Sequence, residues 1–97
     1  MKKSESVEVR ELLNDMDDDI IAFESEEYQR HIPQYHAEAQ ADNYWTNKFL
    51  ANQKAIPECT EMMNIWGTAY IKGKSIRECL ILCREHLLAN YDIKESK

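Results

Sequence analysis

The first third of the chain has apolar residues at steps of three and four positions. They are Val9, Leu12, Leu13, Met16, Ile20 and Phe23. This spacing places all of them on one stripe of a helix, and Ser6 is suited to begin that helix as its N-cap. Pro33 disfavours helical geometry in the residue before it, so we place a break near 30–32. The pattern predicts a first helix over about 5–30, with a kinked continuous helix as the alternative.

Two more helical stripes follow this break. The second helix, expected over about 33–53, has the apolar residues Ala37, Ala41, Tyr44, Trp45 and Phe49. The third helix, expected over about 57–72, has Cys59, Met62, Met63, Trp66, Ala69 and Tyr70. Pro57 suits the first turn of the third helix, and Gly73 suits a left-handed residue at its end.

The last helix has the clearest start signal. Ser75 and Glu78 form a Ser-x-x-Glu capping box, in which each side chain bonds the other residue's backbone amide. The apolar stripe consists of Ile76, Cys79, Leu80, Cys83, Leu87 and Leu88. These signals predict a helix over about 75–90.

Composition agrees with a helical protein. The 97 residues include only two glycines and two prolines, which is few for a sheet protein. We therefore expect an all-α fold, a small bundle of three to four antiparallel helices, in a single domain over 1–97 with loose ends at about 1–4 and 91–97. A first helix of about 25 residues would be roughly 37 Å long and would exceed the others. An overhanging apolar stripe favours a homodimer.

The net charge of −6 is unevenly distributed. Residues 1–30 carry four basic and ten acidic side chains, whereas residues 61–97 carry six basic and five acidic ones. Binding of nucleic acid needs clustered Lys and Arg, so nucleic acid is not the expected partner. A protein with a basic surface suits this chain better.

Several acidic residues of the first helix fall on one side of it. This acidic ridge consists of Glu8, Glu11, Asp15, Asp18 and Glu26. It is either a solvated helix face or a docking surface for a basic partner. On the second interpretation, the candidate partner-binding residues are Glu11, Asp15, Asp18 and Glu26.

Three aromatic residues lie among amides in the second helix. Tyr44, Trp45 and Phe49 are either core residues or anchors of an interface, because Trp and Tyr are frequent anchors of protein interfaces. We include all three among the candidate partner-binding residues. If Trp45 is buried, the interface loses that anchor and only electrostatics remains.

The stretch from Gly67 to Ser75 ends in Gly-Lys-Ser, like a phosphate-binding loop. Five residues separate its glycines where such a loop has four, and the stretch before it is expected to be a helix and not a strand. We therefore do not expect a nucleotide site. A weak anion site at the start of the last helix, formed by Lys72, Lys74, Ser75 and Arg77, stays open. The alternative function, a nucleic-acid accessory factor, would use this turn at 72–77.

Metal and catalytic chemistry have little support in the sequence. Cys79, Cys83 and His86 share a helical face and could hold a metal together with Cys59. However, both cysteines of that face lie in the apolar stripe, where a free thiol acts as a small hydrophobic residue. We therefore predict no metal, no cofactor and no enzymatic activity.

These observations favour a non-enzymatic interaction protein, such as a small acidic inhibitor, adaptor or chaperone of the kind that phages and mobile elements also encode. We expect it to bind a basic protein surface and to be cytoplasmic, because the chain has no export signal and no apolar run of the length of a membrane span. A homodimer is a further expectation.

Overall fold

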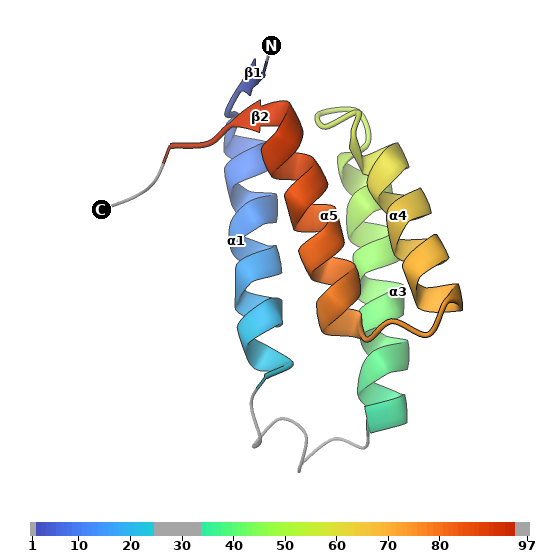
Figure 1. The fold of residues 1–97 in the computed structure, drawn as a ribbon. Coiled ribbons are helices and arrows are strands. Elements are labelled where there is room, and N and C mark those ends of the chain that lie inside the picture. Colours follow the sequence, from blue (N-terminus) through green and yellow to red (C-terminus); the bar gives the residue numbers. More distant parts are fainter. Residues whose placement is uncertain (1, 25–33, 95–97) are drawn as a thin grey trace.

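Four helices make up most of the described residues. The computed structural model describes residues 2–24 and 34–94, apart from the side chains of 34–38. The helices are α1 (Val7–Ala22), α3 (Gln34–Asn52), α4 (Cys59–Ile71) and α5 (Ile76–Asn90). Two short strands, β1 (Lys3–Ser4) and β2 (Tyr91–Asp92), pair in parallel. The predicted all-α bundle is confirmed (Figure 1).

Contacts between helices give their directions. Asp17 of α1 pairs with Arg84 of α5, and Glu24, in the turn after α1, pairs with Arg77. Later residues of the first segment therefore contact earlier residues of α5. The same order holds between α4 and α5, where the sulfur of Cys83 lies near the carbonyl of Met62 and His86 lies near Glu61. Both pairs of helices are therefore antiparallel, and α5 lies between α1 and α4 (Figure 1).

The predicted helix starts are present. The Ser6 hydroxyl accepts a hydrogen bond from the amide of Val9 at 3.2 Å. Both bonds of the capping box between Ser75 and Glu78 are formed, at 3.0 and 3.1 Å. Gly73 has a φ of 87°, the left-handed conformation that ends α4 and favours glycine over other residues.

The first helix ends before the predicted residue 30, and residues 25–30 of the predicted range lie outside the described residues. The amide of Phe23 bonds to the carbonyl of Asp19, and the amide of Glu24 bonds to that of Ile21, so the helix tightens into a turn after Ala22. Phe23 packs against the core from this turn, which explains why the apolar spacing looked continuous. With 16 residues, α1 is shorter than α3, which has 19, so the argument for a homodimer from an overhanging helix no longer holds.

The two ends of the described chain lie together. The sequence predicted loose ends at about 1–4 and 91–97, but Lys3 is aligned with Tyr91 and Ser4 with Asp92 in the strand pair. Residues 1 and 95–97 lie outside the described residues. Tyr91 is buried, so the start of the chain lies beside a core residue. This arrangement places the start of α1 next to the end of α5 (Figure 1).

The core contains both tryptophans. The rings of Trp45 and Phe49 lie 5.7 Å apart, and those of Phe49 and Trp66 lie 6.3 Å apart. Each indole N–H donates to a carboxylate, that of Trp45 to Asp19 at 2.8 Å and that of Trp66 to Asp42 at 2.7 Å. These bonds satisfy the polar atom of each buried ring.

Candidate functional site

The acidic residues of α1 divide into two groups, and the first bonds to side chains of α3 and α5. Asp17 accepts from Arg84 at 2.6 Å, and Asp19 accepts from the indole of Trp45. Asp15 lies 3.2 Å from the ammonium group of Lys48 and also accepts from the hydroxyl of Tyr44. Burial raises the pKa of Asp19, although the bond from the indole opposes that shift. Asp15 is half-buried, and its carboxylate already bonds to two side chains of α3. It is therefore only partly available to a partner protein.

The second group faces solvent. It lies within a strip of exposed α1 residues, which we call the α1 outer face and which consists of Val7, Glu8, Glu11, Asn14, Asp18 and Ile21. Among the residues that the structure describes, Glu8, Glu11 and Asp18 have no ion pair. Glu26, the remaining predicted member of the ridge, lies outside the described residues. The face thus presents three carboxylates between two exposed apolar side chains, Val7 and Ile21.

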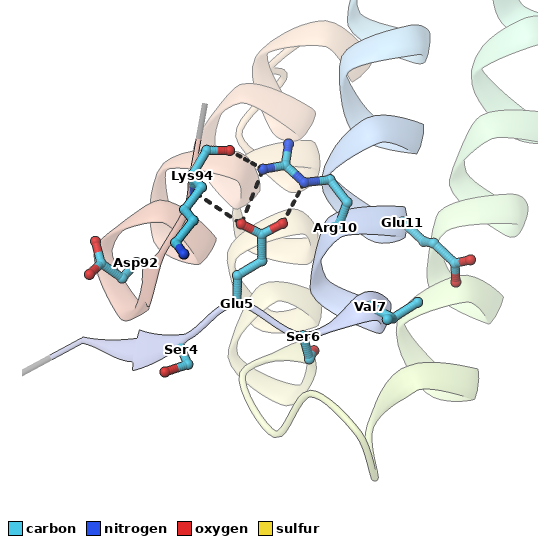
Figure 2. A pocket seen from close by; sticks show the side chains of 8 residues that line it. All are labelled: Ser4, Glu5, Ser6, Val7, Arg10, Glu11, Asp92 and Lys94. Carbon is cyan, nitrogen blue, oxygen red and sulfur yellow. Dashed lines mark hydrogen bonds and ion pairs between the residues drawn. The ribbon is translucent and has the colours of Figure 1, made fainter. Parts of the chain in front are cut away.

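A hollow of about 620 Å³ lies beside the start of this face (Figure 2). The carboxylate of Glu5 binds the guanidinium of Arg10 and accepts from the amide of Lys94, and Arg10 also donates to the carbonyl of Lys94. The bond from Arg10 is the main reason that the pKa of Glu5 lies below its ordinary value. Because Val7 and Glu11 line the same hollow, the α1 outer face begins in a concave region of the surface.

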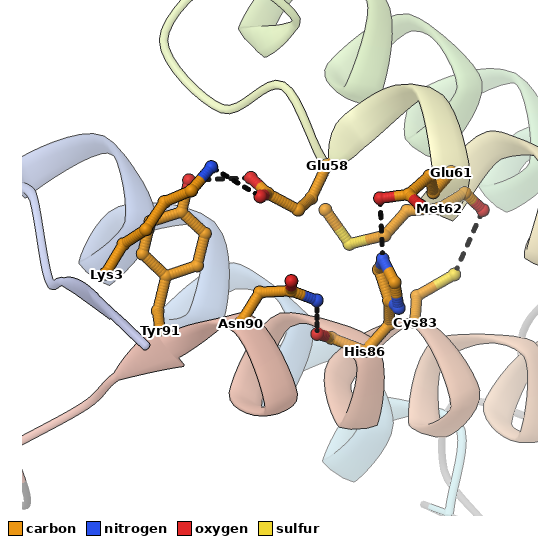
Figure 3. A network of polar contacts seen from close by, with 8 residues as sticks. All are labelled: Lys3, Glu58, Glu61, Met62, Cys83, His86, Asn90 and Tyr91. Carbon is orange, nitrogen blue, oxygen red and sulfur yellow. Dashed lines mark hydrogen bonds and ion pairs between the residues drawn. The ribbon is translucent and has the colours of Figure 1, made fainter. Parts of the chain in front are cut away.

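The chain ends are joined by a second polar network, which we call the terminal clasp and which consists of Lys3, Glu58 and Tyr91 (Figure 3). The carboxylate of Glu58, at 6% exposure, accepts from Lys3 at 2.6 Å and from the Tyr91 hydroxyl at 2.7 Å. Burial alone would raise the pKa of Glu58, but these two bonds, together with a backbone hydrogen bond and the charge of Lys3, bring the pKa below its ordinary value. Burial, together with the bond to Glu58, raises the pKa of Tyr91 to about 12.

The cysteines belong to the core. Cys59, Cys79 and Cys83 are free and buried, and burial raises the pKa of Cys83 to about 12. The thiol of Cys83 lies 3.3 Å from the carbonyl of Met62, whereas His86 pairs with Glu61 at 3.1 Å (Figure 3). Among the side chains of residues 2–24 and 39–94, no group of three or more His, Cys, Asp or Glu is arranged to hold a metal.

The structure corrects the use of two aromatic residues as interface anchors. Trp45 and Phe49 are both 0% exposed, so the core alternative holds for them. Tyr44 is 46% exposed, and its hydrogen bond to Asp15, followed by burial, raises the pKa of its hydroxyl to about 12. Of the three aromatic candidates, only Tyr44 has accessible surface, and its hydroxyl is already bonded.

Two of the four residues of the predicted anion site already have partners within the protein. The hydroxyl of Ser75 caps α5, and the guanidinium of Arg77 pairs with Glu24. Lys72 and Lys74 are exposed and have no ion pair within the described part of the chain. The four predicted anion-binding residues therefore offer two available cations.

An apolar groove of about 370 Å³ begins beside these lysines, along the seam of α4 and α5. Ile65, Ala69 and Leu82 supply its apolar surface, and Lys72 and Lys74 line the end where α4 stops. Sequence periodicity missed this groove, because Leu82 lies outside the apolar stripe of α5.

No family model matches the chain, and neither do any of the curated proteins or solved structures with which it was compared. None of the described helices is both long enough and apolar enough to cross a membrane.

Proposed function

We propose that the protein is a non-enzymatic interaction module that binds a basic surface of another protein through the α1 outer face. Small acidic inhibitors, adaptors and chaperones act in this way. The observation that carries the proposal is the division of the acidic residues of α1. Asp17 and Asp19 bond to side chains of other helices, whereas Glu8, Glu11 and Asp18 point outward without an ion pair among the described residues.

The surroundings of these carboxylates support a docking role. Carboxylates held on a helix keep a fixed spacing, and complementary charge speeds the encounter of two proteins. The face also has apolar anchors in Val7 and Ile21, which are 71% and 65% exposed. These residues replace Trp45 and Phe49 as the apolar part of the proposed interface.

Two double variants test this proposal. Glu11→Gln with Asp18→Asn removes two charges from the face, and Glu61→Gln with Glu85→Gln removes two charges from exposed positions on α4 and α5. Each protein is used to capture partners from a nuclease-treated lysate of the source cells, followed by quantitative mass spectrometry. We expect one protein that the wild type and the second variant capture and that the first variant loses. Equal capture by all three proteins would contradict the proposal.

The alternative function is a nucleic-acid accessory factor that uses the turn at 72–77. The exposed Lys72 and Lys74 favour it, because neither lysine has an ion pair in the described residues. A mobility-shift assay at low salt separates the two functions, since phosphate contacts are strongest there. A shift that Lys72→Gln with Lys74→Gln abolishes would support the alternative function.

A further inference from the structure

The groove between α4 and α5 has the features of a helix-binding site. Its apolar side chains come from two antiparallel helices, and an amphipathic helix commonly binds in such a groove. The side chain of Leu82 is 38% exposed at this seam. Lys72 and Lys74 provide positive charge at one end of the groove, so a helix that combines an apolar residue with carboxylates would match it.

The same chain contains a helix face of this kind. On the α1 outer face, Ile21 lies three positions after Asp18, so the two side chains are neighbours on the helix surface. The two surfaces also differ in charge, because the face carries the carboxylates of Glu8, Glu11 and Asp18 and the groove ends at Lys72 and Lys74. The acidic face and the basic end of the groove are therefore complementary.

The face cannot reach the groove of its own molecule. α5 lies between α1 and α4, and Arg84 and Arg77 of α5 pair with Asp17 of α1 and with Glu24 in the turn after α1. The face points to solvent from α1, whereas the groove opens along the far seam of α5. Contact between the two surfaces therefore requires a second copy of the chain.

We propose that the groove of one copy binds the α1 outer face of another copy, with Ile21 on Leu82 and Ile65 and with Asp18 opposite Lys72. This inference rests on the proposed function, because it uses the same face and names one partner for it. The two surfaces are different, so the contact is head-to-tail and leaves a free face and a free groove at the two ends of a dimer.

Two single variants separate this arrangement from a symmetric dimer. Ile21→Asp alters the face and Leu82→Asp alters the groove, and both positions are exposed enough to accept a charge. Leu50→Asp is the matched control, since it changes an exposed apolar residue of α3 in the same way. Circular dichroism verifies that each variant keeps its helices, and sedimentation velocity at low salt measures association over a range of concentrations.

We expect the wild type and Leu50→Asp to form species larger than the 11.5 kDa monomer as concentration rises. Ile21→Asp and Leu82→Asp should each associate at least about tenfold more weakly, because each variant has lost one surface that every contact needs. An equal mixture of these two variants should again form a dimer, and association should not continue beyond the dimer. The intact groove of Ile21→Asp binds the intact face of Leu82→Asp. The two altered surfaces that remain each carry an added aspartate and repel each other.

A monomeric wild type at every concentration would overturn this inference. So would association of the wild type that the mixture does not recover, since a symmetric interface or another surface would then be responsible. The proposed function fails separately. If the face variant loses a different captured protein while the wild type stays monomeric, only the head-to-tail contact is wrong.

Discussion

The ammonium group of Lys3 lies 2.6 Å from the carboxylate of Glu58, a residue 55 positions further along the chain. The Tyr91 hydroxyl donates to the other oxygen of the same carboxylate. One buried side chain at the start of α4 therefore holds both β1 and β2. Because only Glu5 and Ser6 separate β1 from α1, the terminal clasp also fixes the start of the α1 outer face.

Removal of the clasp carboxylate should destabilise the protein. Glu58→Ala leaves the Tyr91 hydroxyl buried without its acceptor, and we expect the free energy of unfolding to fall by about 1–3 kcal/mol. Glu85→Ala, on the exposed side of α5, should change it by no more than about 0.5 kcal/mol. Urea denaturation measures both values. A loss in Glu58→Ala no larger than that in the control would show that the clasp does not stabilise the fold.

The clasp should also weaken in acid. The pKa of Glu58 is lower in the folded protein than its ordinary value of 4.5. Its stabilising contribution is therefore complete above 4.5 and is lost as the pH falls through the folded pKa. We expect the stability difference between the wild type and Glu58→Gln to be largest near neutral pH and to shrink below 4.5. A difference that stays constant with pH would contradict this prediction.

The two glycines should respond in opposite ways to alanine. Gly73→Ala forces a side chain into the left-handed conformation and should cost about 1 kcal/mol of stability. Gly67 lies inside α4, and a Cβ placed there meets no atom within 4 Å, so Gly67→Ala should stabilise the protein by about 0.5–1 kcal/mol. Thermal unfolding of the two variants compares them directly. Equal shifts of the unfolding temperature in the same direction would argue against the left-handed conformation of Gly73 in the α4–α5 turn.

Fluorescence tests the burial of Trp45. Trp66→Phe leaves Trp45 as the only tryptophan, and we expect blue-shifted emission that iodide quenches weakly, because the ring is 0% exposed. Denaturant should shift the emission to the red and restore quenching. Strong quenching of the folded variant would place Trp45 at the surface and would return it to the list of interface anchors.

Local signals in the sequence predicted the helices well. Ser75 and Glu78 of the capping box are only three positions apart, and Gly73 needs only its own backbone conformation, so both could be recognised without tertiary contacts. The end of α1 could not be recognised. Phe23 continues the apolar spacing whether it packs from a helix or from a turn.

The candidate site depended on contacts between distant residues. Asp17 and Asp19 look like their neighbours on α1 until Arg84 and Trp45, 67 and 26 positions away, come beside them. The burial of Trp45 has the same origin, because the partner of its indole lies on another helix. The sequence therefore predicted an acidic helix, and only the packing showed which of its carboxylates face outward.

The central claim is that the α1 outer face contacts a partner protein, and site-specific photo-crosslinking tests it most directly. A photoreactive residue replaces Asn14, at the centre of the face, or Asn47, an exposed residue of α3. We expect crosslinks from position 14, in the source cells, to a partner protein, which is either a second copy of this chain or a different protein, and none to that partner from position 47. Crosslinks from position 47 alone, or equally from both positions, would contradict the claim.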